Sequence, residues 1–257
     1  MKKRAIGIRY FLVFIGIVLL VPAGRASACL VNTAAASLEG FSIFSELSGL
    51  ITGLNWTVTT GSSATNDIGE TASLPEGEPG WTSWTVAISN SGSQSTSVTG
   101  QSLSIASYAG LTDMGWTGSS GSVILTGSFT AATTGWVMIT LPYSITLDLI
   151  TSDNSSASAY GRAKASISLA QLGGSISTDS IELFSTAYGG DTYFDSRSGE
   201  NYRLGVMKWF VAGETGIFTA EVFTEAVSSS PVPLPGAVWL FAPGFASFLT
   251  LRRRFRK

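Results

Sequence analysis

The chain has 257 residues, of which 12% are charged, with 29 glycines, one cysteine and no histidine. This length suits one ordinary domain together with targeting segments rather than two full domains. The absence of histidine excludes Ser/His/Asp and Cys/His catalytic arrangements and every histidine-based zinc site. A single cysteine can form neither an internal disulfide nor a thiolate cluster.

The charges are segregated along the chain. Ten of the 15 basic residues lie before residue 29 or after residue 251, whereas all 17 acidic residues lie between Glu39 and Glu225. The central part therefore holds five basic and 17 acidic residues, a net charge of −12. Because nucleic-acid binding depends on clustered Lys and Arg, we expect no nucleic-acid partner. The excess of carboxylates favours solubility and could also attract divalent cations.

Residues 1–28 have the order of a secretory signal peptide. A basic start at residues 2–4 precedes an apolar stretch, residues 10–21, which is too short to span a bilayer as a permanent helix. Ala26 and Ala28 then supply the small residues of a signal-peptidase cleavage site. We therefore expect export from the cytoplasm with cleavage after Ala28.

Cys29 would become the first residue of the mature chain, the position at which bacterial lipoproteins carry their acyl chains. The usual lipoprotein signal has a larger aliphatic residue three places before the cysteine, where this chain has Ala26. Lipidation of Cys29 and an ordinary cleavage that leaves a free thiol both stay open.

The C-terminal residues 228–257 have the order of a membrane-sorting tail. A serine spacer leads to a short motif at 232–235, an uncharged stretch at 236–251 and a basic end at 252–257 that begins Arg252, Arg253, Arg254. A helix of 16 residues is roughly 24 Å long, so it spans a hydrocarbon core of about 30 Å only marginally. The basic end should stay cytoplasmic, which would place the acidic domain, residues 29–227, beyond the inner membrane.

This tripartite tail resembles the PEP-CTERM sorting signal of Gram-negative bacteria. Its motif is Val232-Pro233-Leu234-Pro235, with Leu234 where the family usually has Glu, and Trp239-Leu240-Phe241 with Gly244 matches the common interior of the helix, whereas Pro243 departs from it. The resemblance covers about the last 27 residues. It implies processing near the motif by an exosortase-like membrane protease and delivery to the cell surface or the extracellular polymer matrix.

The central domain is rich in Ser, Thr and Gly, and its apolar residues recur with a period of two. The clearest run places Tyr143, Ile145, Leu147 and Leu149 on one face and polar residues on the other, as in a strand with one wet face. The same alternation occurs around Val86, Lys164 and Glu221, and the runs are separated by turn signals: Asn90-Ser91-Gly92, Ser152-Asp153-Asn154-Ser155, Gly173-Gly174 and Gly189-Gly190-Asp191. This pattern predicts an all-β fold, a jelly-roll-like antiparallel β-sandwich.

One segment has a helical period instead. Apolar residues recur there at spacings of three and four, which predicts one face of a helix: Leu38, Phe41, Phe44, Leu47, Ile51 and Leu54.

The densest acidic cluster offers a candidate calcium site. Asp191, Asp195 and Glu200 lie in a Gly-flanked segment whose oxygens could ligate calcium, although the spacing is not that of a recognised calcium loop. The alternative is a solvated loop in which Arg197 pairs with a neighbouring carboxylate. We expect no other cofactor.

Tryptophans offer a candidate sugar-binding surface, because a sugar ring can rest its apolar face on an exposed indole. Trp81 and Trp116 are the better candidates, since Gly80 and Gly115 place them in expected loops. The alternative is that they belong to the core, together with the domain's other tryptophans, among them Trp56, Trp84 and Trp136.

These observations favour a non-enzymatic structural or adhesive protein of the cell surface or of an exopolysaccharide matrix. One alternative is a polysaccharide-binding module, which needs exposed aromatic side chains in one plane. The other is a glycoside hydrolase, which needs two carboxyl groups facing each other in a cleft. The sequence alone selects no such pair.

Overall fold

In a computed structural model, the described residues are 30–41, 49–67, 69–79, 83–89, 91–98, 102–111, 115–151, 157–199 and 201–230. The predicted signal peptide, Cys29 and residues 231–257 of the predicted sorting tail lie outside these ranges, whereas the serine spacer at 228–230 forms the end of β13. Among the described residues, no helix is long and apolar enough to cross a membrane. The strands are β1 (Leu30–Glu39), β2 (Ile51–Asn66), β3 (Thr71–Pro79), β4 (Ser83–Ala87), β5 (Ser91–Val98), β6 (Ser102–Leu111), β7 (Gly115–Ala131), β8 (Gly135–Ile150), β9 (Ser158–Gln171), β10 (Ile176–Tyr188), β11 (Thr192–Arg197), β12 (Arg203–Phe210) and β13 (Thr215–Ser230).

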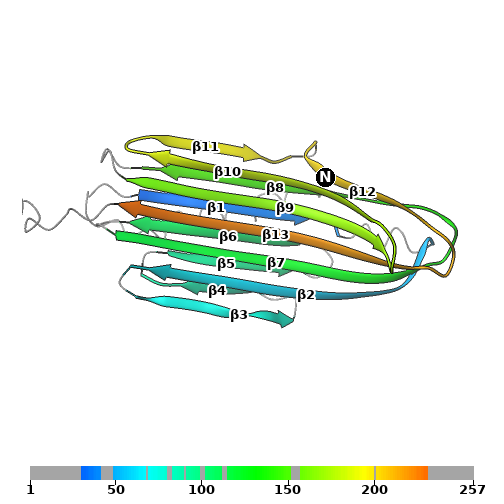
Figure 1. Cartoon of the computed structure of the whole chain (residues 1–257). Helices are drawn as coiled ribbons and strands as arrows, with labels where there is room; N and C mark the ends of the chain where they lie inside the picture. The colour runs from blue at the N-terminus through cyan, green and yellow to red at the C-terminus, as the bar shows by residue number, and fades with distance from the viewer. Residues whose placement is uncertain are drawn as a thin grey trace, which may run out of the picture.

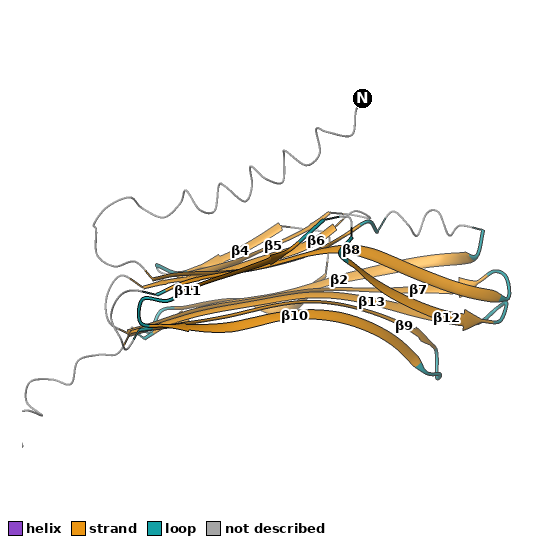
Figure 2. Cartoon of the chain, turned by 90° about the horizontal axis from the view of Figure 1, so that it is seen from above, coloured by secondary structure: helices purple, strands orange, loops and turns teal. Residues whose placement is uncertain are grey.

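The strands form two antiparallel sheets that pack face to face, which confirms the predicted β-sandwich (Figure 2). The seven-stranded sheet has the order β11-β8-β1-β6-β5-β4, with β12 pairing the other half of β8. The six-stranded sheet has the order β10-β9-β13-β7-β2-β3. The strands run along the long direction of the molecule, with β10, β11 and β12 at one edge and β3 and β4 at the other (Figure 1).

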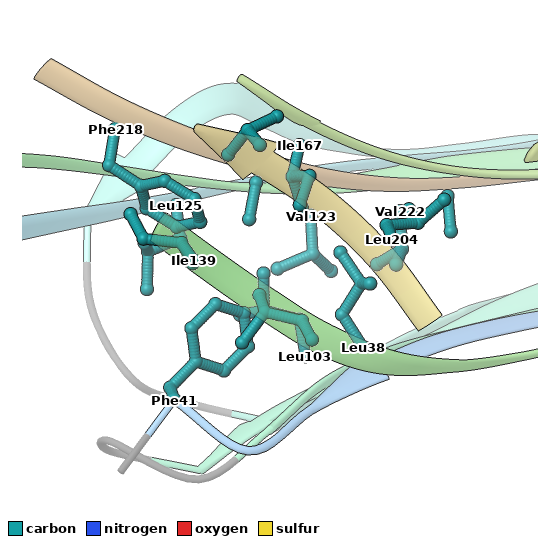
Figure 3. Close-up of a cluster of buried hydrophobic side chains, with 14 of the residues drawn as sticks. Leu38, Phe41, Leu103, Val123, Leu125, Ile139, Ile167, Leu204, Phe218 and Val222 are labelled. Atoms are coloured by element: carbon teal, nitrogen blue, oxygen red, sulfur yellow. The ribbon is translucent and has the colours of Figure 1, made fainter. Parts of the chain in front are cut away.

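The core lies between the sheets and is built by the alternation seen in the sequence. Ile145, Leu147 and Leu149 of β8 are fully buried, and so are the predicted inward rows of β9 and β13, which are Ala163, Ala165, Ile167, Leu169, Phe218, Ala220 and Val222. Val86 is buried in β4 as predicted, whereas the side chain of Trp84 lies outside the described part. Figure 3 shows side chains from both sheets meeting in this cluster.

One end of the core is polar and joins the sheets by hydrogen bonds. The fully buried Asn32 of β1 donates through its side-chain amide to the backbone carbonyls of Tyr160 and Val227 in the opposite sheet, the latter at 2.8 Å. The hydroxyls of Ser107 and Thr224 likewise meet across the sheets at 2.8 Å. Each such bond contributes about 1 kcal/mol, and together they fix how one sheet lies on the other.

The predicted turns after β9 and β10 are confirmed. Gly173 has a φ of 77° between β9 and β10, and Gly190 has a φ of 88° between β10 and β11. Both angles lie in the left-handed region, which glycine enters without a steric penalty.

The predicted helix from Leu38 to Leu54 is wrong where it can be checked, because Leu38 lies in β1 and both Ile51 and Leu54 lie in β2. Residues 42–48 lie outside the described part. Leu38, Phe41 and Ile51 are buried from three different pieces of chain, the end of a strand, a turn and the start of the next strand. Their spacing imitates a helical period, and pairing of β1 with strands on both sides overrides it.

The alternation along β8 predicts that the same substitution lowers stability by very different amounts at an inward and an outward position. Ile145 is fully buried and Ile150 is 39% exposed. We expect Ile145→Ala to lower the free energy of unfolding by about 2–5 kcal/mol, because it leaves a cavity between the sheets. Ile150→Ala is the matched control and should cost under about 1 kcal/mol. Equal losses in urea denaturation would contradict the assignment of the inward row.

Candidate functional site

The first half of β8 and all of β12 form a two-stranded ribbon with large apolar side chains on both faces. Its inner face adds Val137, Ile139 and Leu141 of β8, and Leu204 and Val206 of β12, to the core. Its outer face carries four large apolar side chains that are 45–60% exposed: Trp136, Met138, Met207 and Trp209. These four residues are here called the Trp–Met patch.

Strand register brings the four side chains together. Trp209 lies directly opposite Trp136, and Met207 lies directly opposite Met138. The two indole rings meet edge to face, with centroids 5.6 Å apart and planes inclined at 76°. Such a pair is worth about 0.5–1.5 kcal/mol beyond the area that it buries, so the rings hold one another in a defined arrangement.

The turns around the Trp–Met patch are tied down by polar contacts. The side-chain amide of Gln171 donates to the backbone carbonyl of Trp209 at 3.0 Å and to Oε2 of Glu214 at 3.0 Å. The same Oε2 accepts the backbone N–H of Val211 at 2.7 Å. On the inner face, Phe210 meets Phe129 edge to face at 5.4 Å. The patch is therefore presented on a braced end of the sandwich.

The tryptophans selected from the sequence are not brought together with this patch. Trp81 lies outside the described residues. Trp116 is exposed, but it lies at the start of β7, on the other sheet. The patch lies near the opposite end of β7, where Ala131 precedes the turn into β8. Fifteen residues of strand, about 50 Å, separate Trp116 from Ala131. Trp56 is half-buried and packs against the core.

Sequence reasoning named Trp136 only as one of several tryptophans and missed Trp209 and both methionines. A signal was present, because Trp136 and Met138 alternate with the apolar Val137 and Ile139. A strand that is apolar on both rows has a second face that needs a partner. That Trp209 lies opposite Trp136 follows from the pairing of β12 with β8.

The residues of the predicted calcium site are only partly described. Asp191 lies in the exposed turn between β10 and β11, where its backbone carbonyl accepts hydrogen bonds from the backbone and hydroxyl of Thr151. The carboxylate of Asp195 pairs with Arg197 at 3.4 Å, as expected in the alternative, but both residues lie on strand β11 and not in a loop. Glu200 lies outside the described residues. The described residues contain no group of three potential metal ligands, and calcium binding stays a prediction.

Among the described carboxyl groups, that of Asp148 lies on a long strand of the seven-stranded sheet. Desolvation raises the pKa of the Asp148 carboxyl above its ordinary value. Asp148 lies on the outer face of β8, and its cross-strand neighbours are Thr33 and Phe194, neither of which is acidic. The register of these strands therefore places no second carboxyl directly beside Asp148.

The Trp–Met patch combines two tryptophan rings that hold each other in place with two flexible methionine side chains. Exposed apolar patches on soluble domains usually mark contact sites, and Trp is enriched among the residues that dominate binding energy. Methionine adapts its shape to different partners.

Searches against models of known protein families and against curated protein sequences each gave no match.

The raised pKa of Asp148 predicts a pH-dependent stability. Because the folded pKa lies above the unfolded one, this carboxyl ionises more easily in the unfolded chain, and its contribution to stability falls as the pH rises through the interval between the two. We expect Asp148→Asn to raise the urea midpoint at pH 7 and to leave it nearly unchanged at pH 3, where the carboxyl is mostly protonated in both states. An equal rise at both pH values would contradict this explanation.

Proposed function

We propose that this chain is an exported, non-enzymatic adhesive protein of the bacterial cell surface or of the extracellular polymer matrix. In this proposal its acidic sandwich, of jelly-roll-like type, contacts polysaccharide through the Trp–Met patch. The observation that carries the proposal is the exposed cross-strand pair of Trp136 and Trp209.

The chemistry of the patch suits a polysaccharide. Pyranose rings have apolar C–H faces that can rest on an indole, and the polar edges of the sugar can stay in water. The two indoles are inclined at 76°, so they do not form one flat platform for consecutive sugars. We therefore favour contact with single sugar units along a polymer, which suits adhesion better than a long, sugar-by-sugar binding cleft.

Export and sorting are supported by the sequence. The signal at residues 1–28 and the tail at 228–257 both direct the central domain to the far side of the inner membrane. A domain charge of −12 suits a soluble, hydrated protein in such a matrix. The jelly-roll-like description is supported by a chain that passes repeatedly from one sheet to the other, as from β6 to β7 and from β7 to β8.

The adhesive role is tested by single tryptophan replacements. We expect Trp136→Ala and Trp209→Ala each to weaken binding to the exopolysaccharide of a Gram-negative biofilm by about tenfold or more, which corresponds to about 1.4 kcal/mol. Affinity gel electrophoresis of the full-length chain in mild detergent measures the change.

Trp116→Ala is the matched control, because Trp116 is also exposed but lies on the other sheet. It should leave binding unchanged. Equal losses for all three variants, or no loss for any of them, would show that the Trp–Met patch is not the adhesive surface.

Sorting is tested by intact-mass analysis of surface and medium fractions from the native host, with and without its sorting protease. We expect a mature chain that begins at Cys29 and ends between Pro233 and Pro235, and that disappears when the protease is absent. Retention of Arg252, Arg253 and Arg254 in the final product would instead make the tail a permanent anchor. An added mass on Cys29 would establish lipidation.

A further inference from the structure

The two edges of the sandwich differ in how readily they could pair with a strand from another chain. At one edge β4 has only five residues, and β3 has the sequence TASLPEGEP, with two prolines and two glutamates. Prolines lack the N–H that strand pairing needs, and charges and short strands also discourage pairing. This edge is therefore protected against added strands.

The opposite edge of the six-stranded sheet is formed by β10, a strand of 13 residues without proline or glycine, which is about 43 Å long and pairs only with β9 in its sheet. It also carries two carboxylates, but Glu182 is paired with Arg162, and Asp179 accepts the backbone N–H of Gly205 in β12 at 2.8 Å. Its outer row includes Ile176, Phe184 and Tyr188, all strongly exposed, with Phe184 at 70%. Long apolar edge strands are templates for pairing with another chain.

Charge also favours an acidic domain meeting its own copy at this edge. All five basic residues of the central domain lie on the strands around β10: Arg162 and Lys164 on β9, Arg197 on β11, and Arg203 and Lys208 on β12. Glu182 of β10 pairs with Arg162, and Lys164 pairs with Glu221 at 3.2 Å. The repulsion expected between two bodies of charge −12 is therefore weakest here.

We propose that β10 is a self-association edge, at which two copies of this chain pair their β10 strands antiparallel about a two-fold axis. The two six-stranded sheets then become one continuous sheet. Such an interface is isologous and closes as a dimer. The occupant is a second copy because the basic residues gathered around this edge offset the charge of another acidic domain.

Full overlap of the 13 residues sets that register, with the axis at Glu182. Ile176 then lies opposite Tyr188 of the second copy, and Thr178 lies opposite its Thr186. On the inner row, Ile181 lies opposite Leu183. These apolar and hydroxyl-bearing pairs are of the stabilising kind, whereas Phe184 lies opposite Ser180. On the axis Glu182 lies opposite its own copy, and the Arg162 partner of each carboxylate offsets the like charge.

The dimer would also serve the proposed adhesion, although it does not depend on it. A two-fold axis perpendicular to the joined sheet places both seven-stranded sheets on the same side. Both Trp–Met patches then face the same way, and a polymer that contacts one patch could contact the second with increased avidity.

Cysteine cross-linking tests the register. In full-length chain in mild detergent with Cys29→Ser, we expect Glu182→Cys to give a disulfide-linked dimer under mild oxidation. Directly opposite Cα atoms lie about 4.5–5.5 Å apart, within the range that a disulfide spans. Thr186→Cys is the control on the same exposed row, because its copies would lie about 26 Å apart and should not cross-link. Cross-linking of both variants, or of neither, would overturn the proposal.

Mass measurement tests the association itself. By light scattering, we expect a dimer that Thr178→Lys with Thr186→Lys weakens at least tenfold, because lysines would meet lysines across the axis. Thr71→Lys with Ser73→Lys adds the same charge on β3 and should leave the dimer intact. A monomeric wild-type chain, or equal loss in both double variants, would contradict self-association at β10. Neither assay depends on sugar binding, so failure of adhesion would not affect either result.

Discussion

The two-residue period of long antiparallel strands is the constraint on which this structure depends. Strands such as β7, β8 and β13 have 16 or 17 residues, so each presents an inner and an outer row of about eight side chains. Once one row is buried between the sheets, a slip of a single residue would expose it entirely. The inner rows therefore fix the register, and the outer rows are free to vary with function.

The polar end of the core adds what the apolar rows cannot supply. Apolar packing is nearly non-directional, so it would tolerate small shifts of one sheet over the other. The amide of Asn32 reaches two carbonyls in the opposite sheet, and Ser107 meets Thr224 across the same gap. These contacts are satisfied in only one alignment. The turns beside the Trp–Met patch, at the other end, are tied by Gln171 and Glu214.

The inner rows could be predicted from the sequence, because alternation is a local property. Ile145, Ala165 and Val222 were assigned to strands and inward rows on that basis, and all three are buried. The helix proposed across Leu38 failed because a spacing of three and four arose from separate pieces of chain. Trp209 was missed as a site residue because its significance comes from β12 pairing with β8, more than 60 residues away, and sequence pattern does not encode which strands become neighbours.

The outer surface differs in chemical character between the two edges of the sandwich. The edge at β3 carries proline and glutamate, whereas most of the large exposed apolar side chains in the described part of the chain lie on β8, β10, β11, β12 and the turns between them. Burial in the core cannot account for them, and exposing them to water costs free energy. The edge at β3 and β4 therefore discourages added strands, whereas the edge at β10 exposes apolar side chains that can contact a partner. That asymmetry links the patch on β8 and β12 to the edge strand β10, since both lie on the side where the proposed contacts with polymer and with a second copy would be least opposed by charge.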